Sequence, residues 1–66
     1  MEIGKTIKNL RLEKNMTQTE LATLLFTSQD TISLWERNKS LPDLKSLIKL
    51  STIFNVSTDY ILGLET

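Results

Sequence analysis

Apolar residues recur three and four positions apart along the whole chain, and no segment alternates between apolar and polar residues with period two. This spacing is typical of amphipathic helices and argues against strands. The first predicted helix carries Ile3, Ile7 and Leu10 on one side and ends at Asn15. A second helix is predicted from the apolar residues Leu21, Leu24 and Leu25. Another is predicted from a buried stripe that consists of Leu44, Leu47, Leu50, Ile53 and Phe54.

Capping residues mark where the helices begin and end. Thr17 and Glu20 form a capping box, in which the hydroxyl and the carboxylate each satisfy a free backbone N–H. Ser28, Asp43 and Ser57 have the side chains preferred at the starts of three further helices. The residues expected to end the last three helices are Asn38, Asn55 and Gly63, and those expected to pack the final helix on the core are Tyr60, Ile61 and Leu62. The prediction is a compact, all-α, five-helix domain that occupies residues 1–66 as one unit.

The segment 17–38 predicts two short helices joined by a tight corner. Ala22 is small enough for two steeply crossing backbones to approach, and Ile32 would face it from the next helix. Leu21, Leu25 and Trp35 would fill the core around this crossing. The second helix of the pair begins with polar side chains, as expected of a helix-turn-helix that offers one helix to the DNA major groove. An ordinary helical hairpin is the alternative, but it leaves that polar start unexplained.

The composition excludes several classes of protein. Cysteine and histidine are absent, which removes disulfides, the commonest general base and the commonest zinc ligand. Without a carboxylate pair or a glycine-rich phosphate loop, we expect no enzyme, no cofactor, no metal and no small-molecule substrate. No apolar run approaches the roughly 20 residues of a membrane span, and no signal peptide is visible. The expectation is a cytoplasmic protein with no membrane contact.

The net charge weakens a nucleic-acid interpretation. The chain has eight basic and eight acidic residues, whereas DNA-binding domains usually carry a basic excess. All eight Lys and Arg residues lie in the first 49 positions, and two of the acids, Asp59 and Glu65, lie beyond them. The charge is therefore mildly polarised, and we expect weak non-specific affinity with a shallow salt dependence.

From Ile3 to Leu62 the chain resembles the lambda-repressor-like (Cro/Xre-type) helix-turn-helix domains of phage repressors and small bacterial regulators. The residues that carry the resemblance are Ile3-Gly4, Leu10-Arg11, Thr17-Gln18, Glu20-Leu21-Ala22, Ser28, Thr31-Ile32-Ser33, Trp35-Glu36-Arg37, Pro42, Leu44, Leu47 and Val56-Ser57. The resemblance implies sequence-specific binding of double-stranded DNA through the third helix. It also implies a homodimer, at least on DNA, that binds an inverted repeat.

The resemblance assigns base-reading positions to the exposed side of the third helix. These positions are Gln29, Asp30, Ser33 and Leu34. The amide of Gln29 can form a bidentate pair with N6 and N7 of adenine, and Asp30 can accept from cytosine N4 or adenine N6 although it repels phosphate. Leu34 would contact a thymine methyl group. A solvated helix face with no reading function is the alternative.

Contacts to the DNA backbone are expected from the ends of the helices. The resemblance implies phosphate contacts by Thr17, Gln18, Ser28, Lys39 and Ser40. Hydroxyl groups and the N–H groups at a helix N-terminus are suited to bind phosphate. In the family, the glutamine that Gln18 matches also buttresses a base-reading side chain.

Two further matches concern structure. Arg11 and Glu36 match a pair that forms a salt bridge between the first helix and the end of the third. Phe26 stands where family members commonly have glycine with positive φ, a conformation that would cost a phenylalanine roughly 1–2 kcal/mol. We favour a partly buried Phe26 that fills a surface gap. An exposed aromatic contact for a partner protein is the alternative.

The leading functional hypothesis is a transcriptional repressor that occludes polymerase from its operator. The alternative is a protein-interaction module, such as an antirepressor or a regulatory subunit, that keeps the fold without DNA binding. The apolar residues proposed for a dimer contact are Ile53, Ile61, Leu62 and Leu64, unless Ile61 and Leu62 simply close the core.

Overall fold

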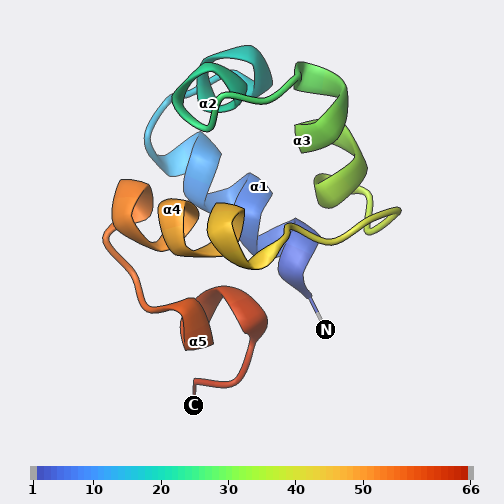
Figure 1. Cartoon of the computed structure of the whole chain (residues 1–66). Helices are drawn as coiled ribbons and strands as arrows, with labels where there is room; N and C mark the ends of the chain where they lie inside the picture. The colour runs from blue at the N-terminus through green and yellow to red at the C-terminus, as the bar shows by residue number, and fades with distance from the viewer. Residues whose placement is uncertain (1, 66) are drawn as a thin grey trace.

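A computed structural model describes residues 2–65, which form five helices and no strand. The helices are α1 (Ile3–Glu13), α2 (Gln18–Leu24), α3 (Gln29–Glu36), α4 (Leu44–Phe54) and α5 (Thr58–Leu62). Figure 1 shows α2 and α3 at one side of α1 and α4, with α5 at the other. The prediction of an all-α, five-helix fold is therefore confirmed.

Four of the helices begin at the capping residues that the sequence indicates. The capping box is complete, because Thr17 Oγ1 accepts from the backbone N–H of Glu20 at 3.0 Å and Glu20 Oε1 accepts from that of Thr17 at 2.8 Å. The other side-chain caps accept a backbone N–H three residues on, and they are Ser28 for α3, Asp43 for α4 and Ser57 for α5. These bonds satisfy N–H groups that have no partner within a helix.

All five helices end in the same hydrogen-bonded turn, which requires a residue with left-handed backbone. The non-glycine residues with positive φ are Asn15, Phe26, Asn38 and Asn55, and Gly63 closes α5. After α3, for example, Asn38 N–H donates to Trp35 O and Lys39 N–H donates to Leu34 O. This pattern satisfies the last carbonyl groups of a helix. Asparagine tolerates the left-handed region, which explains why three asparagines mark helix ends.

The N-terminus of α1 is capped from another element. Glu2 makes no side-chain cap bond, and the backbone N–H of Gly4 donates instead to Asn38 Oδ1 at 3.1 Å. A Cβ atom at Gly4 would lie 2.4 Å from the carbonyl oxygen of Trp35. Glycine is therefore required at position 4, because α1 and the end of α3 approach backbone to backbone.

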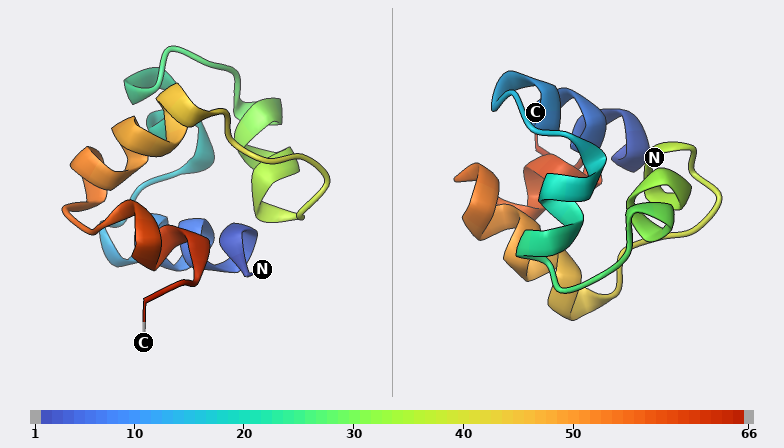
Figure 2. Two further views of the ribbon diagram at one scale, coloured as in Figure 1. Left: turned by 60° about the horizontal axis from the view of Figure 1, so that its bottom comes forward. Right: turned by 90° about the horizontal axis from the view of Figure 1, so that it is seen from above.

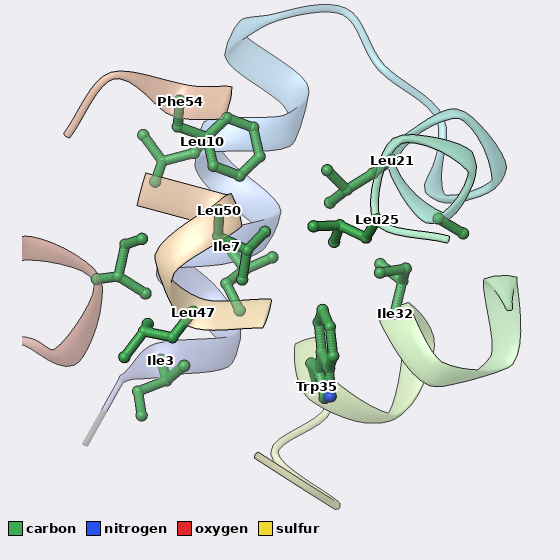
Figure 3. Close-up of a cluster of buried hydrophobic side chains, with 12 residues drawn as sticks. Ile3, Ile7, Leu10, Leu21, Leu25, Ile32, Trp35, Leu47, Leu50 and Phe54 are labelled. Carbon is green, nitrogen blue, oxygen red and sulfur yellow. The ribbon is translucent and has the colours of Figure 1, made fainter. Parts of the chain in front are cut away.

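The core lies between the helix-turn-helix pair and the other three helices. Figure 3 shows Leu21 and Leu25 of α2 beside Ile32 and Trp35 of α3, with α1 and α4 contributing side chains from the opposite side. Ala22 is buried in the same cluster as Ile32, as predicted for the helix crossing. The most deeply buried large side chains are Ile7, Leu21, Ile32, Leu50 and Ile61.

Two of the predicted core residues lie at the surface. Leu44, the first residue of α4, is 73% exposed, and the buried stripe of that helix begins at Leu47. Tyr60 is 46% exposed, whereas its neighbour Ile61 is completely buried. Successive residues of a helix point in directions about 100° apart. Three consecutive residues of α5 therefore cannot all face the core.

Candidate nucleic-acid interface

The outer side of α3 forms one polar surface at the edge of the molecule. Figures 1 and 2 show α3 at the periphery, joined to α2 by a short corner and to α4 by an extended loop. Its inner side is fixed in the core by Ile32 and Trp35. The residues predicted to read bases lie together on the other side: Gln29, Asp30 and Leu34 are exposed and Ser33 is half-buried. The side chains are thus available to a groove that admits a helix.

Gln29 at the start of α3 is held by a residue from α2. Its Nε2 group donates to Oε1 of Gln18 at 2.5 Å, which agrees with the predicted buttressing position of Gln18. One N–H and the Oε1 atom of Gln29 remain for a ligand, because a glutamine amide has two donor hydrogens and one acceptor oxygen. Gln29 therefore offers the donor and acceptor pair that a bidentate contact to adenine needs.

A buried ion pair lies behind Gln18. Arg11 of α1 donates to Glu36 at the end of α3 through two nitrogens, Nε at 2.7 Å and Nη2 at 3.0 Å. The Arg11 and Glu36 side chains are only 9% and 4% exposed. Gln18 Nε2 donates to the same carboxylate at 3.0 Å. The predicted salt bridge is confirmed, and the structure adds that it touches the reading face through Gln18.

The residues predicted to contact phosphate lie around the ends of α2 and α3. Thr17 and Ser28 are exposed, and each also caps a helix with its hydroxyl oxygen. Lys39 and Ser40 are exposed in the loop after α3, where their N–H groups donate to Leu34 O. Gln18 is half-buried. The contacts of these residues with phosphate stay a prediction.

Arg37 belongs to the same face, and sequence reasoning missed it as a contact residue. It is exposed one helical turn after Ser33, and its Nε donates to Ser33 Oγ at 3.2 Å and to Ser33 O at 3.3 Å. The four-residue spacing is the signal that places both side chains on one face. Arg37 brings a cation to a surface that also carries the acidic Asp30.

The prediction of a partly buried Phe26 is wrong. Its side chain is 88% exposed, and its backbone has a φ of 56°. The ring lies beside Lys49 of α4, whose Nζ is 5.0 Å from the ring centroid. A ring with this exposure does not fill a gap in the surface. Phe26 therefore gains little from burial to offset its strained backbone.

The apolar set proposed for a dimer contact is mostly part of the core. Ile61 is completely buried, and Ile53 and Leu62 are half-buried and pack against the core cluster. Leu64 is 63% exposed. Ile61 therefore closes the core with Leu62 packed against it, and a dimer contact through the more exposed members of this set stays a prediction.

The chain belongs to the helix-turn-helix family, whose model matches residues 7–61. It is 43% identical over 63 residues to the HTH-type transcriptional regulator ImmR of Bacillus subtilis (strain 168), covering 96% of this chain and 50% of ImmR. It is 40% identical over 65 residues to the HTH-type transcriptional activator BcrR of Enterococcus faecalis, covering 98% of this chain and 32% of BcrR. The chain thus spans half or less of the length of these two relatives.

Solved structures agree with this assignment. The P22 c2 repressor in complex with a synthetic operator superimposes with a TM-score of 0.91 at 29% identity, covering 98% of both chains. The biofilm regulator SinR in complex with DNA gives 0.81 at 34% identity, covering 91% of this chain and 97% of that one. The fold is therefore that of a lambda-repressor-like helix-turn-helix domain, as the resemblance implied.

Residues 2–65 contain neither a metal-binding cluster nor a membrane-spanning helix. No group of three or more acidic, histidine or cysteine residues is placed to hold a metal ion in that range. None of the helices in that range has both the length and the apolar character needed to cross a membrane. The candidate site is the exposed side of α3 with the ends of α2, where Gln18 holds Gln29.

Proposed function

We propose that this domain is a sequence-specific, DNA-binding transcriptional regulator whose α3 enters the major groove. The observation that carries the proposal is the Gln18–Gln29 hydrogen bond at the exposed start of α3. This bond orients the free N–H and Oε1 of Gln29 toward solvent, on a helix whose other side is buried in the core. The transcriptional regulators among its relatives and the DNA complexes among its structural neighbours support the same conclusion.

The proposed mode of binding is a homodimer on an inverted repeat. Two copies related by a two-fold axis would place their α3 helices about 34 Å apart, one turn of DNA. Gln29, Asp30, Ser33 and Leu34 would face bases, while Thr17, Gln18, Ser28, Lys39 and Ser40 would contact phosphates. Sedimentation of the protein with and without its DNA site tests the dimer.

We further propose repression by occlusion of polymerase, in the cytoplasm. No catalytic role is assigned to the domain. Because the relative BcrR is named an activator, the direction of regulation needs its own measurement. A reporter gene placed downstream of the selected site should fall in expression when the protein is produced. A rise would make the protein an activator and leave the DNA-binding proposal intact.

Selection from random duplex DNA tests the central proposal. We expect enrichment of an inverted repeat whose half-sites are about one helical turn apart. Substitution Gln29→Ala should then weaken binding by about 1–3 kcal/mol and relax the preference at one base position in each half-site. If Gln29→Ala weakens all sequences equally, Gln29 is not a base-reading residue.

The protein-interaction alternative is favoured by two observations, the acidic Asp30 at the exposed start of α3 and the Phe26 ring, which is 88% exposed. The salt dependence of binding separates it from the leading proposal. Each phosphate contact contributes about −0.9 to the slope of log K against log salt, so a few contacts per half-site give a measurable slope. Absence of any enriched duplex, with a slope near zero on all duplexes tested, would favour the interaction module.

A further inference from the structure

A chain of hydrogen bonds runs from the interior to the reading face, and its direction is fixed at the buried end. Arg11 donates to Glu36, Gln18 donates to Glu36, and Gln29 donates to Gln18. We infer that Glu36 is a positioning residue for base recognition, because it sets which atoms of the Gln29 amide face the DNA. This inference rests on the proposed DNA binding and adds a specificity to it.

The carboxylate of Glu36 lies at the buried end of this hydrogen-bond chain. A carboxylate paired with arginine has no hydrogen to donate, so it can only accept. Its Oε1 accepts from Arg11 Nη2 and from Gln18 Nε2, each at 3.0 Å, and its Oε2 accepts from Arg11 Nε at 2.7 Å. Arg11 is itself immobilised, since Nη1 donates to Met16 O at 2.8 Å. Rotation of the Gln18 amide by 180° would bring its oxygen against this carboxylate and is therefore disfavoured.

The orientation of Gln18 then determines the orientation of Gln29. With its nitrogen turned inward to Glu36, Gln18 presents Oε1 outward, and only a donor can meet it. Gln29 supplies Nε2 at 2.5 Å. One N–H of the Gln29 amide is used in the bond to Gln18. The second N–H and Oε1 are left free to contact a base. An amide without this partner would be free to exchange its nitrogen and oxygen positions.

A fixed amide distinguishes the two purines. Adenine presents the N7 acceptor and the N6–H donor in the major groove, and the N–H and Oε1 of Gln29 match them. Guanine presents N7 and O6, which are both acceptors, so O6 would face Oε1 of Gln29. A Gln29 amide that is free to rotate can turn its NH₂ group toward guanine O6 and so avoid the repulsion between the two oxygens. Glu36 therefore favours adenine over guanine without touching DNA.

The first test uses the protein without DNA. Gln18 and Gln29 are the two glutamines of the chain, so their side-chain NH₂ signals are readily assigned by ¹⁵N NMR. We expect a scalar coupling across the hydrogen bond from Gln18 Nε2 to the Glu36 carboxyl carbon, and slow rotation of both amides. In the Gln18→Met variant, which keeps the Arg11–Glu36 pair, the Gln29 amide signals should become those of a free amide.

The second test measures the ratio of adenine to guanine affinity at the base pair that Gln29→Ala relaxes. Gln18→Met should reduce this ratio about tenfold. The double variant Arg11→Met with Glu36→Met should also reduce the ratio of adenine to guanine affinity, although it leaves both glutamines unchanged. Both charges are removed together because a single buried charge without its partner is strongly destabilising. The matched control is Lys39→Ala, which should weaken all sites without changing the ratio.

The outcomes are distinct. A reduced adenine preference in Gln18→Met and in the folded double variant, with other positions unchanged, supports the inference. A folded double variant with the wild-type ratio overturns it, as does a wild-type preference for guanine. If the double variant does not fold, the coupling in the wild type and the ratio in Gln18→Met decide the question. If no duplex is bound at all, the proposed function fails, and the amide signals alone show whether Glu36 orients the glutamines.

Discussion

Two corners flank α3, and each contains a residue with left-handed backbone. Phe26 precedes the helix and Asn38 follows it, both with a φ of 56°. The side chain of Asn38 accepts a hydrogen bond from Gly4 N–H and so joins α1 to α3. The ring of Phe26 is 88% exposed and lies beside the Lys49 ammonium. The same backbone turn thus forms a tertiary contact at the Asn38 corner, whereas the Phe26 corner links the two helices on either side of it.

The fold, and not the residue, dictates the backbone at these corners. In both, the two N–H groups after the helix return to its last carbonyl groups. Asparagine adopts the required conformation at small cost, whereas phenylalanine pays roughly 1–2 kcal/mol. The surrounding helices impose the turn at Phe26 because Leu21, Leu25 and Ile32 are buried on either side of it.

The largest effect is expected where the corner after α3 meets α1. Substitution Gly4→Ala would bring Cβ to 2.4 Å from Trp35 O and 2.8 Å from Glu36 O, so the two backbones must separate. We expect the free energy of unfolding to fall by about 3 kcal/mol. Urea denaturation measures it, with the exposed neighbour Lys5→Ala as a control that changes stability by less than about 0.5 kcal/mol. A tolerated Gly4→Ala would contradict the close approach.

The next largest effect is expected at the hydrogen bond between Asn38 and Gly4. Asn38→Ala removes the acceptor of the Gly4 N–H and puts a less tolerant residue in the left-handed region, so we expect a loss of about 2 kcal/mol. Asn38→Gly keeps the backbone free to turn and removes only the acceptor, and it should cost about 1 kcal/mol. Equal stability of Asn38→Gly and the wild type would show that the bond to Gly4 contributes nothing.

A smaller effect of opposite sign is expected at the corner before α3. Phe26→Asn should raise the free energy of unfolding by about 0.5–1 kcal/mol, because asparagine adopts positive φ more readily. Phe26→Ala keeps the strained backbone and removes only the exposed contact with Lys49, so it should change stability by about 0.5 kcal/mol or less. Thermal unfolding of both variants tests this, and a large loss in either would mean that the ring packs in solution.

The smallest effect is expected at Asp43, which caps α4 at the end of the loop between α3 and α4. Hydrogen bonding from Ser46 lowers the pKa of Asp43 below its ordinary value, and the charges of Lys45 and Lys49 add to the shift. A depressed pKa in the folded state stabilises the fold above the unfolded-state value, and this stabilisation is lost as the pH falls through the folded value. Asp43→Asn keeps a capping side chain that does not titrate.

The measurement for Asp43 is the melting temperature as a function of pH. The wild type should exceed Asp43→Asn at about pH 6, and the difference should shrink toward about pH 3. A difference that stays constant over this range would show that the carboxylate charge does not contribute to the cap.

Much of the fold follows from local sequence. The capping box at Thr17 and Glu20 and the asparagines at helix ends act on backbone groups a few residues away, so their effects can be predicted from spacing alone. The Arg11–Glu36 pair and the exposed start of α3 were predicted through resemblance to a family. In the interface itself, the missed Arg37 contact to Ser33 was available from four-residue spacing.

What the sequence left open depends on which surfaces the helices cover. Leu44 and Tyr60 have the apolar character of core residues, yet they are exposed because no element of residues 2–65 packs over them. Phe26 likewise is large and apolar with nothing beneath it to fill.

The sequence by itself determined the five helices, most of their ends and the helix-turn-helix, because caps, turns and apolar periodicity are local. Only the tertiary structure decided that Asn38 caps α1 across the molecule and that Glu36, Gln18 and Gln29 share one directed chain of hydrogen bonds. Those contacts join residues that are 34, 18 and 11 positions apart. Their donor and acceptor geometry exists only after the helices have packed.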